Sequence, residues 1–428
     1  MSWMRRGRHA VLVAAVVITT ALGASASAGQ ERAETGNAAW VQRALELQYE
    51  LGSDLGFRDA PWVGTHNSFN STAEMGQTIS ANDSNQEITI REQLDQGIRS
   101  IELDLHYFPS VAGGRQTTVV CHARDSSEGN LGCTTEKTFD QVLIGIEAWL
   151  AENPDQVLML YLEDDMDTPP GYEDAGATLD KRLGPMIYRP KPPADGCEEL
   201  PLELSRDAIR AAGKQVFAVS DCGGAASWRG GVFTWDERLE TGIKSFSEFP
   251  ECGTDYTREQ YDETLVRYFE DSTALGAATG DPGKIDETVA AQLARCGVDL
   301  IHFDQLQTDD PRLATVIWSW APGEPGKGSC STQRVGADVP FGRWKSRSCA
   351  GKRLAACRNG GGKWSLSAER VSFAQAKPAC REGKARFAVP RTGYEAQLLR
   401  LAMQADGARG AWLGQRREAG EWLALDRR

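Results

Sequence analysis

The sequence predicts an α/β fold, in which a distorted or incomplete (β/α)8-type TIM barrel is followed by a smaller, disulfide-containing α+β domain. Between Pro61 and about Trp320, short apolar segments rich in β-branched residues alternate with helical segments, which is typical of a mostly parallel sheet. Polar residues recur where the predicted strands end, and TIM-barrel enzymes assemble their sites at that face. The pattern alone also allows an open, doubly wound sheet.

The individual elements follow from local patterns. In the segment 139–152, apolar residues form a stripe with the 3.6-residue period of a helix, and Asn153-Pro154 ends it. The strand segments are shorter runs bounded by turn-forming residues. We expect strands at Trp62–Thr65, Ile98–Phe108, Thr117–His122, Gln156–Glu163, Gln215–Asp221 and Asp299–Asp304, and helices at Phe139–Glu152, Asp207–Ala212, Tyr261–Asp271 and Asp286–Arg295.

The N-terminus has the pattern of a secretory signal peptide. Arginines at positions 5, 6 and 8 precede an apolar run of roughly fifteen residues, which is shorter than the ~20 needed to span a bilayer. Ala-Ser-Ala at residues 26–28 is typical of a cleavage site. We therefore expect residues 1–28 to be removed and the mature chain to be secreted into the extracellular space; an uncleaved anchor is the alternative.

All ten cysteines follow the predicted signal peptide, and no CxxC pair occurs among them. An even number of cysteines in a secreted chain predicts disulfides rather than a zinc or thioredoxin-type site. Cys121 and Cys133 are candidates to close the loop after one strand, and Cys349 and Cys357 are candidates to close a short hairpin. The sequence does not determine the full pairing.

Two domains are expected, because roughly 400 mature residues exceed one ordinary hydrophobic core. The Gly/Pro-rich run Pro322–Ser329 is a candidate linker, which places a barrel domain at 40–325 and a second domain at 330–428. The net charge of −13 disfavours nucleic acid as a partner. From Arg334 onward the chain is basic, which can serve contact with anionic lipid or polysaccharide, although a solvated charged face is the simpler interpretation.

Two histidines are expected at strand ends. His66 lies in Gly-Thr-His-Asn-Ser after the first predicted strand, and His122 follows Val119-Val120-Cys121. A lone histidine at a strand end usually has a structural role. A pair on one barrel face suits phosphoryl transfer, because one can stabilise charge on the phosphorus oxygens while the other protonates the leaving alkoxide.

A set of oxygen donors is expected beside these histidines. Glu102 and Asp104 are two residues apart on one strand, so both side chains point to the same face, where unpaired carboxylates repel each other. A cation relieves this repulsion. With Asn67 and Glu163 the site offers four oxygen donors and no thiolate, which favours calcium, while magnesium requires stricter geometry.

Other interpretations of the charged residues stay open. The carboxylates of the strand 98–108 can instead form salt bridges with Arg91 or Arg99. His106 continues the same strand face and either lines the pocket or has a structural role. Asp164 and Asp165 are expected to be solvated loop charges rather than ligands.

Together these residues resemble the X-type catalytic region of phosphatidylinositol-specific phospholipases C, in particular the calcium-dependent secreted bacterial branch. The matching pieces are His66-Asn67-Ser68, the segment 97–104, His122 and Leu160–Glu163, within roughly residues 60–320. The resemblance implies that His66 and His122 are the catalytic histidines and that Asn67, Glu102, Asp104 and Glu163 bind Ca²⁺. It also implies attack of the inositol 2-hydroxyl on phosphorus, which yields diacylglycerol and a cyclic inositol phosphate.

The C-terminal segment is similar to C-type lectin-like modules. It predicts a helix after Ser372, an extended segment ending at Pro390, a second helix over Gly393–Ala405, and tryptophan-bearing strands around Trp412 and Trp422. The Glu-Pro-Asn or Gln-Pro-Asp loop and the Trp-Asn-Asp strand that bind calcium and sugar in true lectins are absent from the sequence. We therefore expect a scaffold or surface-contact module rather than a sugar-binding one.

The sequence thus predicts a secreted, calcium-dependent phospholipase C-like phosphodiesterase that acts on a phospholipid at a membrane surface. One alternative is a barrel phosphodiesterase for glycerophosphodiesters or sphingomyelin, although those families usually open with His-Arg-Gly rather than His-Asn-Ser. Another is a non-catalytic surface-binding protein that uses the lectin-like domain. The presence of both histidines and all four oxygen donors argues against the latter.

Overall fold

The structure is a computed structural model of the 428-residue chain. It describes residues 24–75, 84–109, 114–122, 133, 137–191, 196–235, 239–240, 246–253, 266–273, 283–336 and 342–426. Among these residues, no helix is both long and apolar enough to cross a membrane.

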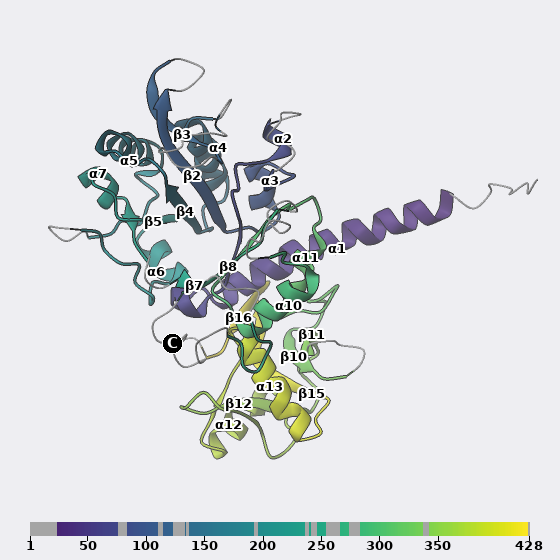
Figure 1. Ribbon diagram of the computed structural model, residues 1–428. Helices are drawn as coiled ribbons and strands as arrows, with labels where there is room; N and C mark the ends of the chain where they lie inside the picture. Colours follow the sequence, from purple (N-terminus) through teal and green to yellow (C-terminus); the bar gives the residue numbers. More distant parts are fainter. Residues whose placement is uncertain are drawn as a thin grey trace, which may run out of the picture.

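The first domain is a TIM-barrel-like sheet of eight parallel strands, as predicted (Figure 1). The strands follow one another around the sheet in chain order, and β9 pairs with β1. Among the described residues, the pairing is interrupted only between β6 and β7, so the barrel is distorted there. The parallel strands are β1 Trp62–Thr65, β2 Ser100–Pro109, β4 Leu158–Asp164, β5 Val216–Ser220, β6 Val232–Phe233, β7 Leu239–Glu240, β8 Val266–Glu270 and β9 Leu300–Phe303, and β3 Gln116–Val120 pairs antiparallel with β2.

Helices lie outside and at the ends of this sheet. The predicted helix at 139–152 is confirmed: its apolar stripe is buried, and a capping box of Thr138 and Gln141 begins it. The helix predicted at 261–271 is wrong, because its second half forms β8. The helices are α1 Ala24–Leu51, α2 Thr72–Met75, α3 Ile90–Asp95, α4 Phe139–Glu152, α5 Pro169–Leu183, α6 Arg206–Ala211, α7 Ala226–Arg229, α10 Glu287–Cys296 and α11 Pro311–Thr315, with a 3₁₀ turn at Phe57–Asp59.

The interior of the barrel changes from apolar to polar along the strands. Because side chains alternate between faces, every second residue of a strand points inward. At the amino ends, Trp62, Met159, Phe217 and Leu300 pack together in one buried cluster. Four residues further along three of these strands lie the polar groups of His66, Glu163 and Asp304. The apolar layer therefore closes the amino end of the barrel and leaves the carboxyl end for chemistry.

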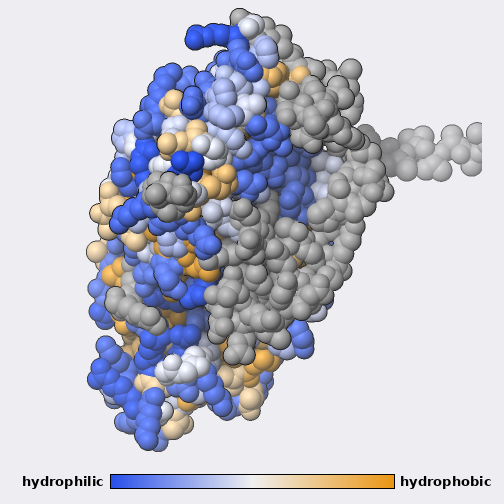
Figure 2. All heavy atoms as spheres, turned by 60° about the vertical axis from the view of Figure 1, so that its left-hand side comes forward, coloured by the Kyte–Doolittle hydropathy of each residue, from blue (hydrophilic) through white to orange (hydrophobic). Residues whose placement is uncertain are grey.

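The second domain is a seven-stranded sheet with two helices, which confirms both predicted helices and the tryptophan-bearing strands. The strand order is β11-β10-β15-β12-β13, with β14 beside β12 and β16 beside β15. Its elements are β10 Cys330–Arg334, β11 Trp344–Arg347, β12 Leu354–Arg358, β13 Trp364–Leu366, α12 Phe373–Glu382, β14 Arg386–Phe387, α13 Gly393–Ala405, β15 Gly410–Glu418 and β16 Glu421–Ala424. In Figure 2 the lower part of the visible face, which belongs to this domain, is mainly hydrophilic.

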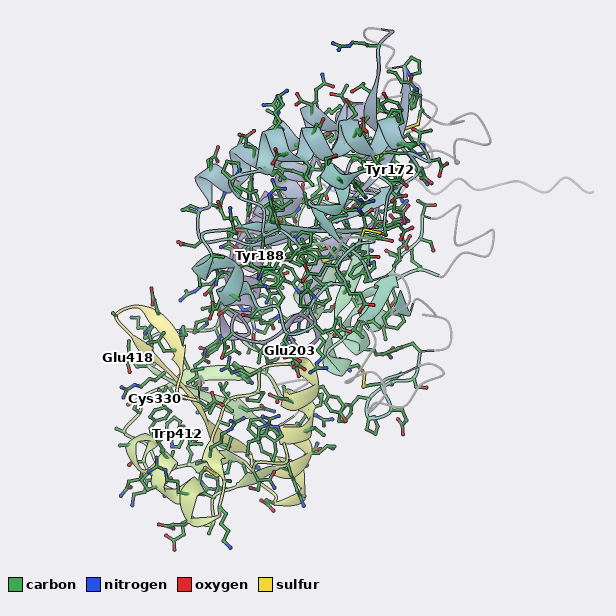
Figure 3. All side chains as sticks on the ribbon, turned by 90° about the vertical axis from the view of Figure 1, so that its left-hand side faces the viewer. Tyr172, Tyr188, Glu203, Cys330, Trp412 and Glu418 are labelled. Atoms are coloured by element: carbon green, nitrogen blue, oxygen red, sulfur yellow. A yellow bond between two sulfur atoms is a disulfide. The ribbon has the colours of Figure 1, made fainter. Side chains whose placement is uncertain are left out.

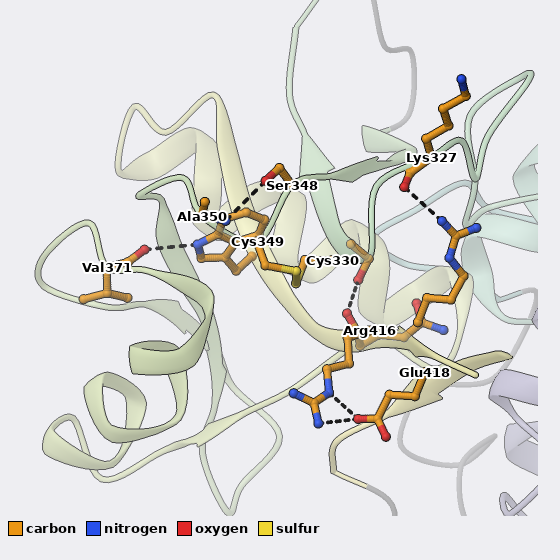
Figure 4. Close-up of a disulfide and its surroundings, with 12 residues drawn as sticks. Lys327, Cys330, Ser348, Cys349, Ala350, Val371, Arg416 and Glu418 are labelled. Atoms are coloured by element: carbon orange, nitrogen blue, oxygen red, sulfur yellow. Dashed lines mark hydrogen bonds and ion pairs between the residues drawn. A yellow bond between two sulfur atoms is a disulfide. The ribbon is translucent and has the colours of Figure 1, made fainter. Parts of the chain in front are cut away.

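All ten cysteines form disulfides. The predicted pair Cys121–Cys133 is confirmed, but the predicted pair Cys349–Cys357 is wrong. Cys349 instead bonds to Cys330 across the β10–β11 hairpin (Figure 4), while Cys357 reaches Cys380 on α12. Sequence proximity suggested the wrong partner because the sheet, not the chain, brings these cysteines together. The other pairs are Cys197–Cys222 and Cys252–Cys296.

The two domains pack directly on each other, at the end of the barrel away from its polar layer. Hydrogen bonds attach the linker Pro322–Ser329 to the second domain. Glu324 accepts from the backbone N–H and from the hydroxyl of Ser346, at 3.1 and 2.6 Å. Arg391 of the second domain pairs with Asp54 at 2.6 Å. In Figure 3, Glu203 lies near this junction and Tyr172 lies at the opposite end of the barrel.

Candidate active site

The site is built from strand ends at the carboxyl face of the barrel. Parallel strands end at the same edge of a sheet, so residues that are distant in the chain meet there. This arrangement brings together five of the six residues predicted from the sequence, and His122 joins them through hydrogen-bonded amides described below. The contributing residues are His66 and Asn67 after β1, Glu102 and Asp104 on β2, His122 after β3, Glu163 on β4, Glu270 on β8, and Asp304 after β9.

Three predicted metal ligands form a compact carboxylate cluster. One oxygen from each of Glu102, Asp104 and Glu163 lies within 4.8 Å of the others. Glu102 and Asp104 are buried, with exposed fractions of 0% and 3%. Burial, together with the neighbouring carboxylates, raises the pKa of both well above its ordinary value. A divalent cation would remove this repulsion, so the donor set fits a hard, oxygen-preferring metal.

Asn67 lies between this cluster and His66. Its backbone adopts a left-handed conformation with φ of 45°, which asparagine tolerates better than most residues. When its amide nitrogen faces Asp104, it donates to both carboxylate oxygens at 2.5 Å, and the amide oxygen accepts from Nε2 of His66 at 3.0 Å. The opposite amide orientation presents the oxygen to the carboxylates. Asn67 is therefore placed to serve either as a donor to Asp104 or as a further oxygen ligand.

His66 is held between two carboxylates that the sequence analysis did not assign. Its Nε2 lies 2.6 Å from Glu270, and its Nδ1 lies 3.2 Å from Asp304. Burial alone would lower the pKa of His66, but Glu270, Asp304 and Glu102 together raise it well above its ordinary value. The imidazole is therefore expected to be protonated at neutral pH, so it can stabilise negative charge on a phosphate.

Hydrogen-bonded amides connect the two predicted catalytic histidines. Asn85 donates to Asp304 at 2.9 Å and lies 3.4 Å from Nδ1 of His66. Asn70 donates to Asn85 at 2.5 Å, and the same nitrogen lies 3.3 Å from Nδ1 of His122. Both amides are buried, whereas His122 is exposed. His122 is thus connected to the site through these amides, and its side chain is exposed.

Glu270, Asp304, Asn70 and Asn85 escaped the sequence analysis for different reasons. Glu270 lies in the segment 261–271, for which the sequence pattern predicts a helix, whereas residues 266–270 form a strand. Asp304 was recognised only as the end of a predicted strand. The available signal for Asp304 was a carboxylate directly after a buried strand. Glu270 gave no such signal, because it is the last residue of its strand and Arg267 interrupts the apolar run there. Asn70 and Asn85 lie in loops, so only the fold shows their positions.

Asp164 and Asp165, which follow Glu163, are partly buried. Asp164 ends β4 and accepts a hydrogen bond from the hydroxyl of Tyr172 at 3.1 Å. Burial raises the pKa of Asp164 to about 7 in spite of that bond. His106 is fully buried and lies 3.4 Å from Asp165, so it packs beneath the loop and does not line an open pocket. The interpretation of Asp164 and Asp165 as solvated loop charges was therefore wrong for Asp164.

The predicted alternative, in which Arg91 or Arg99 neutralises the site carboxylates, is wrong. Arg91 pairs with Asp95 and Glu152 on the outer surface. Arg99 donates to backbone carbonyls and to Gln156, and it stacks on Trp149. Neither guanidinium is in contact with the carboxylate cluster. No arginine therefore neutralises the cluster through these two predicted pairs.

Comparison with known proteins is consistent with this geometry. Residues 26–310 match the model of the family described as the Rv2075c PI-PLC-like domain. The chain is 40% identical over 395 residues to the uncharacterized protein Rv2075c of Mycobacterium tuberculosis strain H37Rv, covering 87% of this chain and 79% of that protein. The PI-PLC X domain-containing protein At5g67130 of Arabidopsis thaliana is 30% identical over 141 residues, which cover 32% of this chain and 31% of the relative.

Solved structures with a similar arrangement include phosphatidylinositol-specific phospholipase C from Listeria monocytogenes, with 14% identity, a TM-score of 0.38 and coverage of 62% of this chain and 94% of that one. A calcium-dependent phosphoinositol-specific phospholipase C from Pseudomonas sp. shows 13% identity, a TM-score of 0.35 and coverage of 60% and 93%. With TM-scores this low, the family assignment depends on the family model and on the mycobacterial relative.

Proposed function

Because the chain belongs to the Rv2075c PI-PLC-like domain family, we propose that it is a secreted, calcium-dependent phosphodiesterase that cleaves phosphatidylinositol. Membership of this family supports a phospholipase C-like enzyme. The identity of the metal and of the lipid headgroup goes beyond the family and is proposed here. The observation that carries the proposal is the cluster of Glu102, Asp104 and the partly buried Glu163 beside a histidine with a raised pKa. Five disulfides support an extracytoplasmic location.

The donor set supports calcium as the proposed metal. Glu102, Asp104, Glu163 and the amide oxygen of Asn67 are hard oxygen ligands, and calcium accepts such ligands in flexible geometry. When bound, calcium would act as a Lewis acid that lowers the pKa of a substrate hydroxyl and stabilises charge on the phosphate. In its absence, the same carboxylates repel one another and hold protons.

Proton transfer and charge stabilisation are assigned to residues of the chain. A carboxylate of the cluster takes the proton of the inositol 2-hydroxyl as this oxygen bonds to phosphorus. His66, oriented by Asp304, stabilises the negative charge that develops on the phosphoryl oxygens. His122, at the exposed edge, gives a proton to the glycerol oxygen as the phosphorus–oxygen bond breaks. The products are diacylglycerol and a cyclic inositol phosphate.

The second domain is part of the same proposal. We infer that it is a C-type lectin-like module, since its helices at 373–382 and 393–405 and its strands around Trp412 and Trp422 fit the predicted pattern. It packs on the end of the barrel away from the site, through contacts such as the tilted rings of Trp320 and Trp422, whose centroids are 4.6 Å apart. A scaffold or surface-contact role suits this position better than a role in catalysis.

The test is hydrolysis of phosphatidylinositol vesicles by wild type, by His66→Ala and by two matched variants. Glu163→Gln changes the carboxylate cluster, whereas Glu203→Gln makes the same substitution at the opposite end of the barrel (Figure 3). We expect His66→Ala and Glu163→Gln to lower the rate at least about 100-fold, and Glu203→Gln to retain it. Cleavage of glycerophosphoinositol or sphingomyelin, with no cleavage of phosphatidylinositol, would overturn the proposed substrate.

A further inference from the structure

A buried histidine crosses the first strand of the barrel to reach the carboxylate cluster. β1 lies between β2 and β9, and Gly64 of β1 is paired with Ser100 on one side and with His302 on the other. Adjacent strands are about 4.8 Å apart, so β2 and β9 are separated by about 10 Å. The ring of His302 spans this gap: Nε2 lies 2.8 Å from the hydroxyl of Ser100, and Nδ1 lies 2.8 Å from Oε2 of Glu102.

The missing side chain of Gly64 makes this crossing possible. A Cβ at position 64 would overlap with Cδ2 of His302, and it would lie 2.5 Å from Nε2 and 2.8 Å from Cβ of Ser100. Non-bonded carbon atoms need about 3.5 Å or more. The glycine of the Gly-Thr-His-Asn-Ser segment is therefore required as the space through which His302 reaches β2.

The hydrogen-bond pattern fixes the orientation of the imidazole. When a cation keeps Glu102 ionised, its carboxylate only accepts hydrogen bonds, so in that state Nδ1 of His302 donates to Glu102 and Nε2 accepts from the Ser100 hydroxyl. Ser100, Glu102 and His302 are all fully buried. Bonds of this kind in a dry interior hold a side chain in one rotamer, because the alternatives leave a buried polar group unsatisfied.

We propose that His302 is a positioning residue that fixes the carboxylate of Glu102 for cation binding, with Ser100 and Gly64 fixing His302 in turn. This inference rests on the proposed calcium site. Partners that orient a metal ligand typically contribute 10–100-fold to metal affinity. His302 touches neither the cation nor the substrate in this role, so its loss changes the calcium affinity through Glu102.

The experiment is calcium titration calorimetry of the intact protein and of matched variants. His302→Leu removes both hydrogen bonds and should weaken the calcium Kd about 10–100-fold. His302→Gln keeps an amide donor and should recover part of the loss. Ile301→Ala is the control, because Ile301 is buried on the same strand but packs in the cluster on the other face. It should lower Tm while leaving the calcium Kd unchanged.

The outcomes separate this inference from the proposed function. Equal calcium Kd values for wild type and a folded His302→Leu would overturn the positioning role alone. If His302→Leu does not fold, Ser100→Ala takes its place: it removes the hydroxyl donor and should weaken the calcium Kd several-fold, and an unchanged Kd would overturn the proposal. If Ile301→Ala weakens the calcium Kd as much as His302→Leu does, the effect of His302→Leu is merely structural and the positioning role is overturned. A wild type that binds no calcium would overturn the calcium site and the positioning role together.

Discussion

The substitution Glu163→Gln should stabilise the metal-free protein at pH 8, although it removes a predicted calcium ligand. Burial, and then the charges of Glu270, Asp165 and Asp221, raise the pKa of Glu163 from an ordinary value of 4.5 to about 7, although His66 opposes this. In the folded, metal-free protein, the ionised carboxylate is therefore disfavoured relative to the unfolded chain. Glutamine has a similar shape and carries no charge, so it avoids this cost.

The structure gives both the sign and the size of this effect. Because the pKa of Glu163 is higher in the folded than in the unfolded state, its contribution to stability is fully present below about pH 4.5 and is lost as the pH rises through about 7. Each pH unit in this interval corresponds to about 1.4 kcal/mol. At pH 8 the variant should therefore gain at most about 3 kcal/mol in its free energy of unfolding over wild type. This gain corresponds to a rise of about 5 °C in Tm. At pH 4.5 wild type and variant should unfold at the same temperature.

The assay is differential scanning calorimetry in chelator at pH 4.5 and pH 8, with Glu203→Gln as the control. The quantity compared is the difference in Tm between variant and wild type, because His302 also makes the stability depend on pH, in the opposite direction. Burial lowers the pKa of His302 to about 3, so the contribution of His302 to stability is lost as the pH falls below 6.5. That contribution cancels in the difference. A Glu163→Gln variant that is less stable than wild type at pH 8 would refute the reasoning.

Two further substitutions test the histidines. Asp304→Asn removes the charge beside Nδ1 of His66 and should lower kcat about 100-fold with little change in KM, measured by steady-state kinetics; an unchanged kcat would show that the imidazole is oriented without Asp304. Replacing Cys121 and Cys133 by serine removes the disulfide next to His122 and should lower kcat by a larger factor than it changes KM; full activity of this double variant would contradict a role of the disulfide in placing His122.

The parts of the site that the sequence predicted correctly depend on local patterns. Glu102 and Asp104 share a face because strand side chains alternate, and His66 follows a short apolar strand. Such features need no knowledge of distant residues. The structure places these residues and Glu163 together as expected, because strands in a parallel sheet end at a common edge.

The parts that escaped prediction depend on contacts between distant residues. His302 meets Glu102 across 200 positions of the chain, and Asp304 meets His66 across 238. No local spacing encodes these pairs. In the segment 261–271, polar and apolar residues follow a pattern that fits a helix, yet residues 266–270 form β8 because they pair with β9 in the barrel. Tertiary pairing overrides local preference there, and with it the position of Glu270.

The most direct test of the calcium-dependent cleavage is the rate of cyclic inositol phosphate release from phosphatidylinositol vesicles as a function of free calcium. The carboxylate cluster predicts no measurable release in chelator and a saturable rise when calcium is restored. The rise should be lost in Glu163→Gln. A rate that is indifferent to chelation would contradict the metal site, whatever the substrate.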